Sequence, residues 1–116
     1  MNIGKDYADG RLTLYLEGEL DHHSARPAMK AIEQAMEETL PRLCVLDMAG
    51  LSFMDSSGIA LILKAHKLAR AGGGEVRVEH PSRQVLRVME TSGIERIVPI
   101  AQEIGKEWGI CVFPIT

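Results

Sequence analysis

Apolar and polar side chains alternate along residues 11–17, where a leucine stands at every second position. This two-residue period predicts a β-strand with one face on a core. Residues 3–8 supply a partner strand, and Asp9-Gly10 is a typical turn for a two-residue hairpin. The chain is therefore expected to begin with an antiparallel hairpin, followed by a loop over residues 18–23.

A helical period follows this loop. Ser24 is expected to cap a helix that ends before Pro41, because apolar residues recur at the spacing of one helical face. The nearly unbroken apolar run at 43–48 predicts a central strand that is covered on both faces. A second helix is expected over residues 57–71, and the three glycines at 72–74 end it.

The alternation of strands and helices continues toward the C-terminus. Residues 75–80 predict a strand, residues 81–93 a third helix, and residues 97–100 a short edge strand that contains a proline. The order β-β-α-β-α-β-α-β predicts an α/β sandwich: a mixed, mostly parallel sheet with helices packed against it and an antiparallel N-terminal hairpin. The tail is ambiguous, because 101–108 could form a helix interrupted by a glycine, whereas 109–116 resembles an extended apolar segment.

Length and charge narrow the class of protein. The chain has 116 residues, enough for a single domain over residues 1–116, and its composition is 46% hydrophobic, so it can bury a core. The net charge of −3 argues against direct binding to nucleic acid, which normally needs a basic face. No apolar run approaches the roughly 20 residues that span a bilayer, and the N-terminus lacks the pattern of a secretory signal. Two distant cysteines, Cys44 and Cys111, predict buried free thiols and a cytoplasmic location.

Two features meet at the start of the second helix. Residues 59–63 are apolar on all sides, which indicates either deep burial or a hydrophobic surface kept for a partner. Just before them, Asp55, Ser56 or Ser57 could cap the helix. Ser56 could also carry a phosphate, which adds roughly −1.5 to −2 charges and is tolerated at the positive end of a helix dipole. Such a group would alter a docking surface and leave the fold intact.

Metal and enzyme chemistry have little support in the sequence. The adjacent His22 and His23 have no further histidine at a metal-ligand spacing, so we expect no metal site. Their segment is either a plain polar loop or a loop that contacts a partner. Glycines 72–74 lack the lysine of a phosphate-binding loop, and Ser56 is not in a Gly-x-Ser-x-Gly elbow. We therefore expect a protein that is not an enzyme.

Two segments together resemble the anti-sigma factor antagonist family, whose members consist of a STAS domain. The similarity extends over roughly residues 2–100, in the order of elements and in the segment at 89–94. The two motifs are Gly18-Glu19-Leu20-Asp21-His22-His23-Ser24-Ala25 and Leu51-Ser52-Phe53-Met54-Asp55-Ser56-Ser57-Gly58-Ile59. One departure is the tail at 101–116, because the family usually closes with a helix.

The resemblance implies a cytoplasmic, non-catalytic regulator of transcription in a spore-forming bacterium. The unphosphorylated protein would bind an anti-sigma factor that is also a serine kinase, and so release a sporulation sigma factor. That kinase would phosphorylate Ser56, and a serine phosphatase would restore the binding form. The chain would hold no cofactor, since ATP and magnesium would belong to the kinase.

The resemblance also implies which residues contact the partner. They are Asp21, His22, His23, Ser24, Asp55, Ser57, Gly58 and Ile59. An antagonist in a general stress-response sigma pathway, or a subunit of a larger sensory assembly, would share the fold and the serine. A small-ligand-sensing STAS module is a further alternative, whereas a membrane protein is not expected.

Overall fold

Six strands form one sheet in the order of the sequence, and a computed structural model describes residues 1–103 and 111–112. The strands are β1 (Asn2–Ala8), β2 (Arg11–Leu20), β3 (Leu43–Met54), β4 (Glu75–Glu79), β5 (Ile100–Glu103) and β6 (Cys111–Val112). β1 is antiparallel to β2, the strands from β2 to β5 are parallel, and β6 is antiparallel to β5. This mixed, largely parallel sheet with its N-terminal hairpin confirms the predicted fold class.

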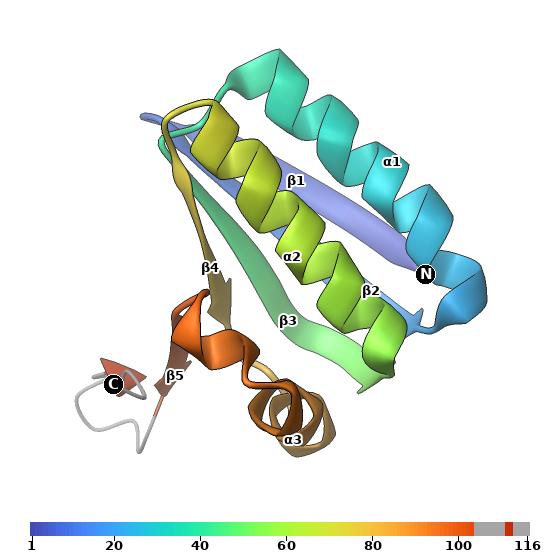
Figure 1. The fold of residues 1–116 in the computed structure, drawn as a ribbon. Coiled ribbons are helices and arrows are strands. Elements are labelled where there is room, and N and C mark those ends of the chain that lie inside the picture. Colours follow the sequence, from blue (N-terminus) through green and yellow to red (C-terminus); the bar gives the residue numbers. More distant parts are fainter. Residues whose placement is uncertain (104–110, 113–116) are drawn as a thin grey trace.

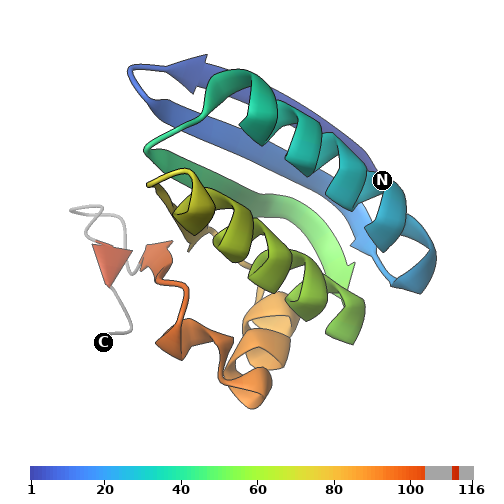
Figure 2. The ribbon, with the colours of Figure 1, turned by 45° about the horizontal axis from the view of Figure 1, so that its top comes forward.

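Three helices and one 3-10 turn complete the part of the fold that the structure describes. They are α1 (His22–Thr39), α2 (Ser56–Ala71), α3 (Arg83–Ser92) and η1 (Ile94–Arg96). Figure 1 shows α1 and α2 lying side by side across the sheet, with α3 beside the end of β3. The turned view in Figure 2 shows α1 and α2 on one side of the strands. In the described part of the chain, no helix is long and apolar enough to cross a bilayer.

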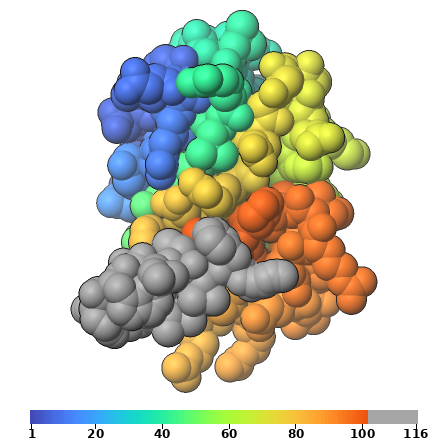
Figure 3. All heavy atoms as spheres, turned by 90° about the vertical axis from the view of Figure 1, so that its left-hand side faces the viewer, coloured from blue at the N-terminus to red at the C-terminus, as the bar shows by residue number. Residues whose placement is uncertain are grey.

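The N-terminal hairpin forms as its turn predicts. Asp9 and Gly10 both have positive φ, 52° and 80°, and connect β1 directly to β2. Positive φ at both central residues is the signature of the type I′ turn, whose twist matches that of the flanking strands. Figure 3 shows this hairpin in blue at one end of a side face, while the orange segment that contains α3 and η1 lies at the other end.

The core lies between the sheet and the helices. The leucines that alternate along β2, namely Leu12, Leu14 and Leu16, are fully buried. Ile32 and Met36 of α1 belong to the same buried cluster. Burying one such side chain contributes roughly 1.5–3 kcal/mol to folding, so the alternating pattern of β2 is a major source of stability. β3 is buried on both faces as predicted: Cys44 and Val45 are adjacent, point to opposite faces and are both fully buried.

The two central strands are longer than the sequence pattern predicts. β2 continues to Leu20 and β3 to Met54, because the parallel pairing extends to the pair Leu20–Met54 with two register shifts along the way. Each shift places an extra residue in one strand and breaks the simple alternation. The expected loop over residues 18–23 is therefore wrong, since its first part belongs to β2 and His22 and His23 belong to α1.

The last predicted strand also differs. Residues 97–99 precede β5, which begins at Ile100, and the Pro99 carbonyl accepts a hydrogen bond from the Val78 N–H at 2.9 Å. A proline can supply this bond because the carbonyl, and not the missing N–H, takes part. β5 lies between β4 and β6, so it is not an edge strand as predicted. Residues 101–103 are strand and not helix, and the rest of the tail, apart from β6, lies outside the described residues.

Candidate functional site

Asp21 caps the N-terminus of α1. Its Oδ1 accepts hydrogen bonds from the backbone N–H groups of His23 (3.0 Å) and Ser24 (2.9 Å). Ser24 Oγ accepts in turn from the Asp21 N–H (3.0 Å) and donates to the Glu19 carbonyl (2.9 Å). Because these bonds favour the ionised carboxylate, and first of all the bond from the Ser24 N–H, the pKa of Asp21 lies below its ordinary value. The prediction of Ser24 as the cap is wrong, since Ser24 is the reciprocal partner in a capping box.

Asp55 has the same role at the start of α2. Its Oδ1 accepts a hydrogen bond from the Ser57 N–H at 2.8 Å, and its carbonyl accepts one from the Gly58 N–H at 2.9 Å. Ser56 is the first residue of α2, one position earlier than predicted. Of the three candidates for the cap, the structure thus selects Asp55. Ser56 is exposed, whereas Ser57 is half-buried.

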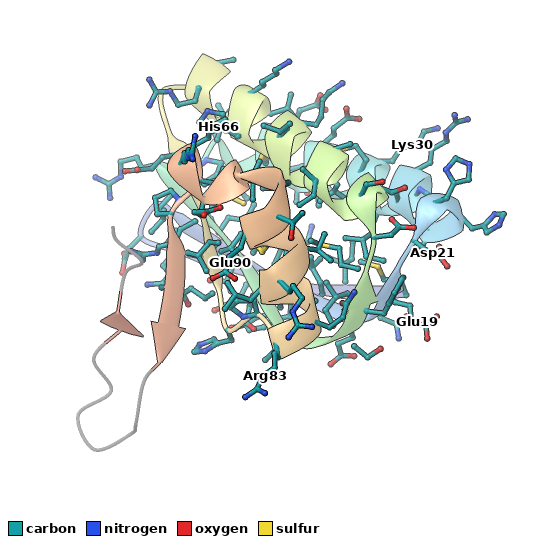
Figure 4. The ribbon with its side chains drawn as sticks, turned by 60° about the horizontal axis from the view of Figure 1, so that its bottom comes forward. Glu19, Asp21, Lys30, His66, Arg83 and Glu90 are labelled. Atoms are coloured by element: carbon teal, nitrogen blue, oxygen red, sulfur yellow. The ribbon has the colours of Figure 1, made fainter. Side chains whose placement is uncertain are left out.

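The two capped helix starts lie next to each other because they follow neighbouring parallel strands. Leu20 and Met54 are paired at the ends of β2 and β3, and the Asp55 N–H donates to the Leu20 carbonyl at 3.2 Å. Figure 4 shows Asp21 and Glu19 at this edge of the molecule. Both sequence motifs are therefore brought together at the carboxyl ends of the strands. In open α/β sheets this edge is the usual place of binding sites.

Gly58 lets α2 begin close against these strand ends. A β-carbon at this position would overlap the Met54 side chain and lie 3.0 Å from Leu20 Cδ2. Gly58 itself is buried. A glycine is therefore needed for packing, which explains its place in the motif without any contact with a partner.

Two surface grooves flank the start of α2 on opposite sides. The groove between α1 and α2 has a volume of about 370 Å³, and His22, Arg26, Ser57 and Lys64 are among its lining residues. The groove between α2 and α3 has a volume of about 400 Å³ and is lined in part by Ser56. The two serines of the motif thus face different grooves.

The apolar start of α2 is divided between core and surface. Leu61 and Ile62 are buried, with exposed fractions of 3% and 0%. Ile59 is half-buried and lines the groove between α2 and α3, while Ala60 lines the groove between α1 and α2. Just before the helix, Phe53 is 39% exposed. Deep burial is thus confirmed for Leu61 and Ile62, whereas Ile59 leaves apolar area in the groove that Ser56 also lines, and a role of this area in binding a partner stays a prediction.

Comparison with known proteins assigns the fold. The sequence profile of the STAS domain matches residues 3–107. The chain belongs to the STAS domain family. The anti-sigma F factor antagonist of Paenibacillus polymyxa is 35% identical to this STAS domain over 100 residues, 86% of each chain. The anti-sigma-B factor antagonist of Bacillus subtilis (strain 168) is 28% identical over 105 residues, 87% of this chain and 93% of that protein.

A solved structure supports the same assignment. The structure of the anti-sigma factor antagonist SpoIIAA in its unphosphorylated form matches this STAS domain with a TM-score of 0.76 and 26% sequence identity, over 91% of each chain. These relatives are antagonists of other proteins, so the STAS domain belongs with binding regulators and not with enzymes, as the sequence predicts.

The histidine pair of this STAS domain lies at the surface of α1. The ring centroids of His22 and His23 are 5.7 Å apart. Among the described residues, the potential metal ligands that converge are Asp47, Glu79 and His80, which lie outside both motifs. Glu79 Oε2 is already within 3.5 Å of Arg11 and 3.4 Å of Arg77. These two positive charges neutralise the carboxylate and oppose a cation there.

Gln84 in α3 is a structural residue of the site that the sequence analysis missed. Its Nε2 donates to the Met54 carbonyl and its Oε1 accepts from the Met54 N–H, both at 3.0 Å. Met54 lies two residues before Ser56, so this double hydrogen bond fixes α3 beside the motif. A glutamine in an amphipathic helix gives no sequence signal for a contact 30 residues away.

Proposed function

We propose that this STAS domain is a cytoplasmic anti-sigma factor antagonist that phosphorylation of Ser56 switches off. The observation that carries the proposal is an exposed serine in the first turn of α2, at the edge where both sequence motifs meet. The unphosphorylated protein binds an anti-sigma factor serine kinase and releases a sporulation sigma factor. A serine phosphatase reverses the modification, and ATP and magnesium are held by the kinase.

The surface around Ser56 suits a protein partner. Ile59 lines the same groove as Ser56, Phe53 is an exposed apolar residue three positions earlier in the chain, and the α1 cap at Asp21 adds a polar group at the same edge of the sheet. Exposed apolar area with a polar border is characteristic of protein-binding surfaces. The partner is therefore expected to cover the starts of α1 and α2 together.

The position of Ser56 also explains how a phosphate could act without unfolding the chain. The helix cap is made by Asp55, so modification of Ser56 leaves the capping hydrogen bond intact. The positive end of the α2 dipole partly offsets the added charge. A partner that closes over Phe53 and Ile59 would have to bury this charge, which strongly disfavours binding.

The first test is phosphorylation by the cognate anti-sigma kinase with ATP. We expect the parent and Ser57→Ala to incorporate one phosphate and Ser56→Ala to incorporate none, because Ser56 is exposed whereas Ser57 is half-buried. Mass spectrometry of the intact chain measures the incorporation. Equal labelling of Ser56→Ala and the parent would disprove the assignment.

The second test is binding of the unmodified kinase partner. We expect Ser56→Ala to bind like the parent and Ser56→Asp to bind at least about tenfold more weakly, a loss of about 1.4 kcal/mol. Calorimetric titration of each variant provides the dissociation constants. Equal affinities of the two variants would contradict the switch.

A general stress-response pathway is the second candidate. The similarity to the anti-sigma-B factor antagonist favours it, and its mechanism would use the same surface. Titration against anti-sigma factors of both classes separates the two pathways, because a cognate pair should bind far more tightly than a non-cognate one.

A further inference from the structure

The groove between α2 and α3 contains one strong positive charge next to Ser56. Its lining residues are Ser56 and Ile59 of α2 together with Arg87, Val88, Thr91 and Ser92 of α3. The remaining lining is apolar or hydroxyl-bearing, so Arg87 is the only charged residue among them. Arg87 is exposed.

Arg87 is not engaged in an ion pair with any of the described residues. The ion pairs of the described chain use Lys5, Arg11, Lys64 and Arg77 as their cations. The guanidinium of Arg87 is therefore available to an anion that enters the groove. Guanidinium is well suited to phosphate, because it can donate two parallel hydrogen bonds.

The double hydrogen bond of Gln84 fixes the side of α3 that carries Arg87. Gln84, Val88 and Thr91 recur at helical spacing and lie on one face. Gln84 binds the backbone of Met54, and the other two line the groove beside Ser56. Arg87 adjoins this face one turn after Gln84. The element that carries the arginine is thus tied to the strand end that carries the serine.

We propose that the α2–α3 groove is an intramolecular phosphate site in which Arg87 receives the phosphate of Ser56. This rests on the proposed function only for the identity of the modified residue. The phosphate is held by charge-assisted hydrogen bonds from Arg87 and by the N-terminal end of α2. It then lies over Ile59 and Val88, so the modification closes the apolar groove as well as adding charge.

Phosphorus-31 NMR tests the proposal on protein with phosphorylated Ser56 installed during translation, so that no kinase is needed. The second pKa of a serine phosphate is near 6, and a neighbouring guanidinium lowers it. We expect the second acid dissociation constant of the phosphate to be about three- to tenfold larger in the parent than in Arg87→Gln.

Arg83→Gln is the matched control. Arg83 lies one turn earlier on α3 and carries the same charge, but it does not line the groove. Figure 4 shows its side chain pointing away from the ribbon at the start of the helix. We expect Arg83→Gln to titrate like the parent. Equal shifts in the two glutamine variants would overturn the proposal, since they would indicate a diffuse charge effect, and so would no shift in Arg87→Gln.

A charge-preserving variant separates the role of Arg87 from a structural one. With Arg87→Lys, the phosphate pKa should be nearly as low as in the parent. A phosphate pKa equal to that of Arg87→Gln would overturn the proposal. The two hypotheses can fail separately: absence of phosphorylation by the kinase would remove the proposed function, whereas the titration reports on the groove alone.

Discussion

Asp21 and Asp55 occupy equivalent positions at the single-residue scale. Each follows a parallel strand, each caps a helix with its carboxylate, and the caps are joined through the hydrogen bond from Asp55 to Leu20. Ser24 contributes to the first cap through its hydroxyl, which links α1 back to β2. The acidic residues of both motifs therefore build the local structure that presents Ser56.

Replacement of Asp21 by asparagine tests the charge of the first cap. Asparagine keeps the capping geometry but cannot ionise. Because hydrogen bonds lower the folded-state pKa of Asp21, its ionisation stabilises the fold above the unfolded-state pKa of about 4, and this contribution is lost as the pH falls through the folded-state value. We expect the parent to exceed Asp21→Asn in stability at pH 7 and the difference to shrink toward pH 2.5. Urea denaturation at several pH values measures it, and a pH-independent difference would contradict this origin.

At the scale of elements, α3 hydrogen-bonds to the end of β3 in the way that a neighbouring strand would. β4 pairs with β3 along Leu43–Asp47, so none of the described strands lies beside the last part of β3 on that side. Gln84 meets the backbone of Met54 there with a donor and an acceptor, as a neighbouring strand would. α3 is thereby placed against the end of β3, and its groove faces the start of α2.

Replacement of Gln84 by alanine should weaken this connection. Loss of both hydrogen bonds leaves the Met54 N–H and carbonyl without their partner, at a cost of about 1–2 kcal/mol in the free energy of unfolding. Urea denaturation measures the loss, and amide hydrogen exchange at Met54 shows whether it is local. Gln34→Ala is the control, because among the described residues the Gln34 amide bonds only to Glu38, on an exposed helix face. Equal losses in the two variants would argue against a special role of Gln84.

At the scale of the whole molecule, the core encloses a thiol. Cys44 lies in the central strand with no exposed surface, and burial raises the pKa of its thiol to about 12. The thiolate, which is the reactive form, is then scarce at neutral pH. The reactivity of this thiol therefore depends on opening of the core.

Thiol labelling should report on this opening. In a Cys111→Ser variant, Cys44 is expected to react with a disulfide reagent at pH 8 at least about a hundredfold more slowly than the same chain in denaturing urea, because the native thiol is both buried and protonated. Absorbance of the released reagent gives the rate. Rapid labelling of the native chain would show that the core opens locally near β3.

The alternating leucines of β2 and the Asp9-Gly10 turn made the hairpin and the fold class predictable, since both are local signals. The strand ends were not predictable, because bulges near Gly18 interrupt the two-residue period. The positions of Asp21 and Asp55 were visible as polar residues before helices, yet the choice of these residues as the caps, and the reciprocal bond from Ser24 at the first cap, depend on backbone geometry. Gln84 could not be found, because its partner is distant in the sequence and chemically unspecific.

The close approach at Gly58 affects how sequence variation in this motif should be interpreted. Any larger residue there must displace the side chain of Met54 or Leu20. The substitution would therefore disturb the packing of α2 against the strand ends, whether or not a partner binds. Invariance at Gly58 among relatives would thus record a steric requirement, whereas invariance at Ser56, which is exposed and does not cap the helix, would record selection for signalling. Two residues of one motif, only two positions apart, can therefore be constrained by unrelated pressures.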